Sequence, residues 1–144
     1  MTLSALTPRE ASIFACFCDT VVAPEPELPA VSHTSAVAFL DGWLAASPRL
    51  NRLALRGLLY AAELAPRGLG LPARLRLLDA EQRGHALAIA EAARSRHARQ
   101  LVRLLEDIAC LSYYGDVAVM RQLGYDADAN VQRARELRRR EGRP

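Results

Sequence analysis

Apolar residues recur every three or four positions in one stretch of the chain after another, which is the spacing of one face of an α-helix. No stretch alternates between apolar and polar residues as a half-buried β-strand would, and no internal repeat is present. We therefore expect an all-α fold, a single compact bundle of five to six helices with a short C-terminal helix and a basic tail. The predicted helices span about 8–22, 34–46, 48–64, 79–94 and 95–113, with short ones over 73–78 and 117–123.

Capping signals mark the ends of these helices. Thr7-Pro8-Arg9-Glu10 and Asp79-Ala80-Glu81-Gln82 are capping boxes, in which the first side chain accepts from the fourth residue's amide and the fourth side chain reaches back. Ser47-Pro48 predicts an N-cap and a first turn. Residues 66–72 contain two prolines and two glycines and predict a loop. Three further caps are predicted, Ser95 and Asp116 at helix N-termini and Gly124 at a C-terminus.

The breadth of the apolar faces predicts which residues are buried. The helix at 48–64 is apolar on more than one side, so we expect it at the centre of the bundle. Trp43 shares a stripe with other apolar residues and is expected in the core. Cys16, Cys18 and Cys110 are an odd number of cysteines and predict no disulfide framework, so we interpret them as small core residues.

Charge divides the chain into two parts. Residues 131–144 carry six arginines against two glutamates, while the rest of the chain is close to neutral. The net charge of +3 therefore reflects the tail rather than the whole surface. We predict a helical bundle domain over residues 1–130 and an Arg-rich C-terminal tail over 131–144.

Candidate catalytic groups are few. Glu81 and His85 lie one helical turn apart and, with His97, form the alternative of a small metal-binding protein or enzyme. The Glu-x-x-His pairs of di-iron bundles and the HExxH motif are absent from the sequence. A nucleophile elbow, a phosphate loop and a dinucleotide fingerprint are absent as well. We expect no catalytic residue, no metal site and no cofactor in this chain, and interpret Glu81 and His85 as a surface pair.

The arginine-rich tail raises the further alternative of nucleic-acid binding, through Arg138-Arg139-Arg140 above all. However, the tail has no interleaved aromatic residues, and the body shows no helix-turn-helix signature. A solvated terminal helix is the preferred interpretation, and no nucleic-acid partner is expected.

The first residues lack the basic and apolar regions of a signal peptide, and no apolar run is long enough to cross a membrane. We therefore expect a cytoplasmic protein without a membrane span, although export together with a partner stays open.

Three segments together resemble one known family. Leu6-Thr7-Pro8-Arg9-Glu10 is followed by Cys18-Asp19-Thr20-Val21-Val22-Ala23-Pro24, and the middle of the chain carries Leu78-Asp79-Ala80-Glu81-Gln82-Arg83. Near the end, Tyr113-Tyr114-Gly115-Asp116 precedes Leu123-Gly124-Tyr125. In order and spacing, these segments are similar to the gluconate 2-dehydrogenase subunit 3 family. Two departures are an additional Ala23 before the proline and the lack of the twin-arginine export signal that many members carry.

The resemblance implies a non-catalytic accessory subunit that binds a large flavin-dependent oxidoreductase of the glucose-methanol-choline type. It would stabilise, mature or help to export that partner, which acts on an alcohol or sugar and holds the FAD. The tyrosines around the sharp turn also suit an interface, because their rings are apolar and their tips are polar. An alternative interpretation is that these rings clamp the short helix onto the bundle. The candidate partner-interface residues are Tyr113, Tyr114, Asp116, Gly124 and Tyr125.

Overall fold

The structure is a computed structural model that describes residues 2–125 and 127–140 of the chain. Within these residues every regular element is a helix, which confirms the all-α class. The arginine-rich end, interpreted from the sequence as a solvated terminal helix, forms a helix as far as Arg140. The predicted domain boundary between residues 130 and 131 lies inside this helix. The elements are α1 (Pro8–Val22), η1 (Val31–His33), α2 (Ala36–Ala46), α3 (Arg49–Gly68), η2 (Leu75–Leu77), α4 (Ala80–Glu91), α5 (Arg96–Tyr114), α6 (Val117–Gln122) and α7 (Ala127–Arg140), where η marks a 3-10 helix.

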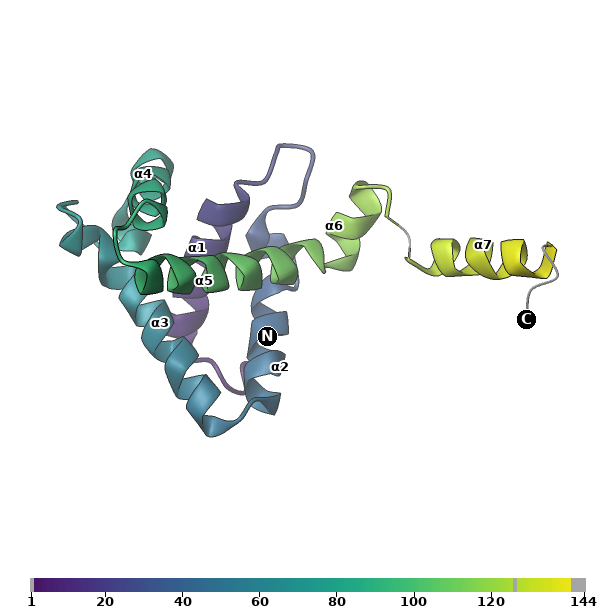
Figure 1. The fold of residues 1–144 in the computed structure, drawn as a ribbon, viewed down its shortest axis with the longest axis horizontal. Helices are drawn as coiled ribbons and strands as arrows, with labels where there is room; N and C mark the ends of the chain where they lie inside the picture. Colours follow the sequence, from purple (N-terminus) through teal and green to yellow (C-terminus); the bar gives the residue numbers. More distant parts are fainter. Residues whose placement is uncertain (1, 126, 141–144) are drawn as a thin grey trace.

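Helix α1 lies in the middle of the bundle and contacts α2, α3, α4 and α5. Helices α2 and α3 are joined by a short turn and diverge from it, while α5 runs across the bundle and leads into α6 (Figure 1). Helix α7 projects away from the other helices (Figure 1), and its side chains from residue 129 to 140 are all exposed. The core therefore belongs to the first six helices.

The core is built from the facing sides of α1, α2, α3 and α5. Burying each large apolar side chain contributes roughly 1.5–3 kcal/mol of transfer free energy. Its most completely buried members are Ile13, Phe14, Cys18, Ala36, Leu40, Leu44, Leu59, Leu105, Ala109 and Tyr113.

The predicted caps at Thr7, Asp79, Ser95 and Gly124 are confirmed. Both capping boxes form, with Thr7 accepting from the Glu10 amide and Asp79 accepting from the Gln82 amide. Ser95 accepts from the Ala98 amide. Gly124 has a φ of 74°, the left-handed conformation that a residue without a side chain adopts at no steric cost. Hydrogen bonds between near neighbours in sequence set these helix ends.

Two predicted helix ends are wrong. Ser47 does not cap α3, since Pro48 is the N-cap residue and the Ser47 hydroxyl donates back to the Trp43 carbonyl. Helix α3 also continues through Pro66 to Gly68, where a loop was predicted. Pro66 is buried, so its ring packs into the body of the protein and offsets the amide hydrogen bond that a proline cannot make.

Two expectations about burial are also wrong. Trp43 is 47% exposed instead of lying in the core, because the buried side of α2 is formed by Ala36, Leu40 and Leu44. Cys110 is only partly buried, whereas Cys18 is fully buried. Burial raises the pKa of the Cys18 thiol to about 12.

A buried carboxylate on α2 holds the N-terminal segment. Asp41 accepts hydrogen bonds from the Ser4 amide at 2.8 Å, the Ser4 hydroxyl at 2.7 Å, the Ala5 amide at 2.9 Å and the Leu6 amide at 2.7 Å. Burial by itself would raise the pKa of Asp41, but these four donors outweigh it and hold the pKa well below its usual range. Asp41 thus ties α2 to the segment that leads into α1.

Two other buried carboxylates pair with arginine. Glu10 of α1 lies 3.4 Å from Arg56 of α3, whose guanidinium also donates to the Ala5 carbonyl. Glu63 of α3 accepts from Arg76 of η2 at 3.0 Å. The first pair joins α3 to α1 and the second joins α3 to the η2 that follows it, so the contacts that orient α3 include specific polar ones.

Candidate protein-binding surface

Helix α3 carries two apolar sides, and only one of them is covered. Leu55 and Leu59 face the core, and Leu59 is fully buried. Leu50 is 76% exposed and Leu53 65% exposed, and both lie on the opposite side of the helix. Helix α3 is apolar over a broad part of its circumference, as predicted. The prediction that it lies at the centre of the bundle is wrong, because the other helices pack against one side of it only.

Helices α5 and α2 repeat this pattern. On α5, Leu105 is buried. Leu101, Leu104 and Leu111 lie along an adjoining stripe of the same helix and are each about half exposed. On α2, Phe39 and Trp43 are exposed one turn apart. We call these exposed side chains of α2, α3 and α5 the outer apolar set; its members are Phe39, Trp43, Leu50, Leu53, Leu101, Leu104 and Leu111.

The total surface agrees with an uncovered bundle. The chain exposes 9611 Å², whereas a compact monomer of 15.8 kDa exposes about 7,300 Å². The difference of about 2,300 Å² exceeds the roughly 800 Å² that each partner buries in a standard protein–protein interface. The projecting α7, whose side chains from residue 129 to 140 are all exposed, contributes to this excess.

The tyrosine corner, made up of Tyr113, Tyr114 and Tyr125 around the turn between α5 and α6, has a buried and an exposed part. Tyr113 is 0% exposed, its hydroxyl donates to the Pro29 carbonyl at 2.7 Å, and burial raises the pKa of its phenol. Its ring meets that of Tyr114 edge to face at 5.2 Å between centroids. Tyr113 is therefore the clamp that fastens α5 to the loop before α2. Tyr114, Gly124 and Tyr125 are exposed and remain candidates for a partner contact.

Asp116 is also occupied inside the protein. Its carboxylate caps α6 by accepting from the Ala118 and Val119 amides, and it accepts from the Ser35 amide at 2.8 Å and the Ser35 hydroxyl at 2.6 Å. Burial alone would raise the pKa of Asp116, but these donors hold it below its ordinary value. Asp116 joins α6 to the start of α2 and has little surface left for a partner, being buried.

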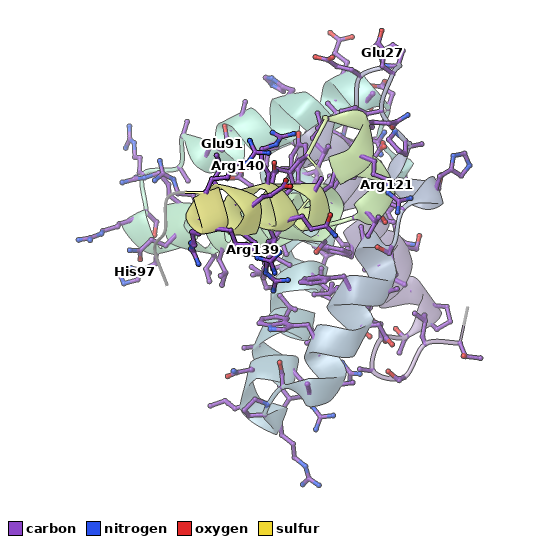
Figure 2. The ribbon with its side chains drawn as sticks, turned by 90° about the vertical axis from the view of Figure 1, so that its right-hand side faces the viewer. Glu27, Glu91, His97, Arg121, Arg139 and Arg140 are labelled. Carbon is purple, nitrogen blue, oxygen red and sulfur yellow. The ribbon has the colours of Figure 1, made fainter. Side chains whose placement is uncertain are left out.

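The residues of the metal-binding alternative do not come together. Glu81 and His85 are exposed on successive turns of α4, and His97 is exposed at the start of α5, at the edge of the molecule in Figure 2. Among the described residues, no three His, Cys, Asp or Glu side chains are grouped as ligands of one metal ion. The geometry gives no support to that alternative.

One cluster of titratable side chains lies where α4 ends beside α5. The hollow between these helices is lined by Glu91, Glu106, Arg99 and Arg103. Burial, followed by the neighbouring Glu91, raises the pKa of Glu106 to about 6. Two carboxylates and two guanidinium groups therefore line one hollow at the contact between α4 and α5.

A groove opens between α3, α4 and α5. Its volume is about 200 Å³, and six alanines keep it open where larger side chains would fill it. Its polar lining residues are Thr20 of α1 and Arg83 of α4. Sequence analysis missed this groove, because alanines scattered over three helices produce no local signal. The lining alanines are Ala61, Ala62, Ala65, Ala86, Ala90 and Ala98.

Five of the six arginines of the tail lie within α7. Arg139 and Arg140 lie near the end of that helix, which stands in front of the body in Figure 2. The predicted tail residues 141–144 fall outside the described part of the chain. In the described part, no helix is long and apolar enough to cross a membrane.

Comparisons with protein-family models, with curated proteins and with solved structures found no match for this chain. The link to a particular family therefore depends on the sequence resemblance alone, while the candidate surface depends on the structure.

Proposed function

We propose that this chain is a non-catalytic subunit that binds a larger protein through its outer apolar set. The observation that carries the proposal is the second apolar side of α3, where Leu50 and Leu53 are exposed although each would gain transfer free energy by being covered. Leu50 and Leu53 are neighbours three positions apart on one side of α3, and contiguous exposed apolar surface on a soluble protein usually marks a binding site.

The chemistry of the set supports protein as its partner. Interface centres favour aromatic and large apolar residues, and the outer apolar set contains Trp43 and Phe39 besides its leucines. Tyr114 and Tyr125 offer amphipathic side chains at the α5–α6 end of the bundle, as suits the edge of an interface.

For the identity of the partner, the sequence resemblance supports a large flavin-dependent oxidoreductase. The partner would hold the FAD and carry out the oxidation of an alcohol or sugar. The small chain would cover an apolar region of the partner and so stabilise it or assist its maturation.

Affinity purification from the native host tests both levels of the proposal. The tagged chain is expected to co-purify with a larger protein in a stoichiometric complex that shows flavin absorbance. Replacing Leu50 and Leu53 by aspartate should abolish that complex, since two desolvated charges would oppose docking. The matched control replaces Val131 and Leu137 of α7 by aspartate, two exposed apolar residues outside the set, and should keep the complex.

Each result has a distinct meaning. A complex without flavin would overturn the oxidoreductase assignment but keep the protein-binding role. A monomeric chain that recovers no partner, or a complex unaffected by the Leu50 and Leu53 changes, would overturn the binding role of the outer apolar set.

A further inference from the structure

The groove between α3, α4 and α5 has the chemistry of a binding site for an amphiphile. Phe17, Leu75 and Leu105 are buried at its base, while Ala61 and Leu101 are exposed at its rim. The lining is apolar apart from Thr20 and Arg83. A ligand that fits must therefore be apolar over most of its length and polar at one place.

Arg83 marks that place. Its side chain lines the groove and also an adjoining shallow hollow beside Asp19, Ala23 and Pro24. The guanidinium thus stands where the apolar groove gives way to a more polar opening, which suits the head of an amphiphile.

The contacts of Arg83 leave its Nη2 atom loosely engaged. Nη1 donates to the Cys16 sulfur at 3.0 Å. Nη2 lies 3.6 Å from the carboxylate of Asp19, which is a loose pair, and Nε is buried without a hydrogen-bond partner in the described residues. A ligand carboxylate at Nη2 would form the charge-assisted hydrogen bond that the loose pair with Asp19 does not provide.

The size of the groove selects the apolar part of the ligand. A dry cavity of about 150 Å³ is large enough for benzene, whereas sites for drug-sized molecules measure about 300–1,000 Å³. At about 200 Å³ this groove suits a slim alkyl chain, not a helix with its side chains.

We propose that the groove binds a medium-chain carboxylate, with its alkyl chain between α3, α4 and α5 and its carboxylate on Arg83. Leu101 belongs both to the rim of this groove and to the outer apolar set. The test uses the isolated full chain without a protein partner, so the two proposals can fail independently.

Isothermal titration of the full chain with decanoate, below its micelle concentration, tests the proposal. We expect saturable binding of one decanoate per chain. Decanol should bind at least about tenfold more weakly, because a charge-assisted hydrogen bond contributes about 1.5–3 kcal/mol. Decyltrimethylammonium should bind more weakly still, since its head repels the guanidinium.

Variants separate the head from the tail of the ligand. Ala90→Phe fills the groove and should abolish binding, whereas Ala88→Phe is the matched control on an exposed position of α4 that does not line the groove. Arg83→Gln should weaken decanoate binding about tenfold. Asp19→Asn should strengthen it several-fold by removing the carboxylate that competes for Nη2.

Circular dichroism establishes that each variant is folded, and Asp19→Asn keeps the test decisive if Ala90→Phe does not fold. The proposal is overturned if decanoate shows no saturable binding, if folded Ala90→Phe binds like the parent chain, or if the cationic amphiphile binds as well as decanoate.

Discussion

The joints, where a buried carboxylate links two helices, differ from the outer side of α3. The polar side chains of the joints are fully hydrogen-bonded, whereas the apolar side chains of the outer side are uncovered. At the joints, Asp41 and Asp116 each accept four hydrogen bonds from residues that would otherwise be loosely held. On the outer side of α3, by contrast, Leu50 and Leu53 remain exposed. Buried polar groups are thus paired where the helices meet, whereas large apolar side chains stay uncovered on the outer side of α3. This difference is the basis of our proposal that the outer side of α3 serves an external contact.

The sharpest test of this comparison uses two leucines of the same helix. Leu59→Ala should lower the free energy of unfolding by about 2–5 kcal/mol, because it leaves a cavity in the core. Leu50→Ala should change it by less than about 0.5 kcal/mol, as is usual for surface substitutions. Urea denaturation of both variants measures the difference, and equal losses would show that the two sides of α3 are not distinct.

A smaller effect is expected at the Asp41 joint. Asp41→Ala should cost about 2–3 kcal/mol of unfolding free energy, since it leaves buried donors unsatisfied. Glu27→Ala removes an exposed carboxylate of a loop, labelled in Figure 2, and should cost less than about 0.5 kcal/mol.

The same joint predicts a pH dependence. The pKa values of Asp41 and Asp116 are lower in the folded than in the unfolded chain. Their contribution is therefore present above the ordinary aspartate pKa near 4 and is lost as the pH falls through the folded values. Asp41→Asn should flatten the decline of stability below about pH 4, and an unchanged acid limb would show that Asp41 does not carry it.

The smallest effect concerns the tyrosine corner. Tyr113→Phe removes the hydrogen bond to Pro29 and should cost about 1 kcal/mol, while Tyr114→Phe should cost almost nothing because its hydroxyl is on an exposed side chain. Thermal unfolding of the two variants side by side measures this. A larger loss from Tyr114→Phe would reverse the assignment of the clamp.

Features set by near neighbours could be predicted from the sequence. The capping boxes at Thr7 and Asp79 and the left-handed Gly124 depend on residues within one helical turn, so their signals are local. The all-α class follows from the same spacing rules. Helix α3 shows where local signals mislead. It continues through Pro66 beyond its predicted end, because tertiary packing buries the proline ring.

Long-range features could not be predicted. Periodicity shows that a side of a helix is apolar but not what covers it, which is why α3 and Trp43 were wrongly placed inside. Asp41 meets Ser4 across 37 positions of sequence, and no local pattern announces such a contact. The candidate interface shifted for the same reason, because the burial of Tyr113 depends on the distant Pro29.

Site-specific photo-crosslinking tests the central claim most directly. A photoreactive phenylalanine analogue placed at position 53, on the outer side of α3, is compared with the same analogue at position 131 of α7 in the native host. We predict a crosslink from position 53 to one larger, flavin-containing protein, and none to that protein from position 131. Crosslinks from both positions alike, or none from position 53, would contradict the assignment of the outer apolar set as the binding surface.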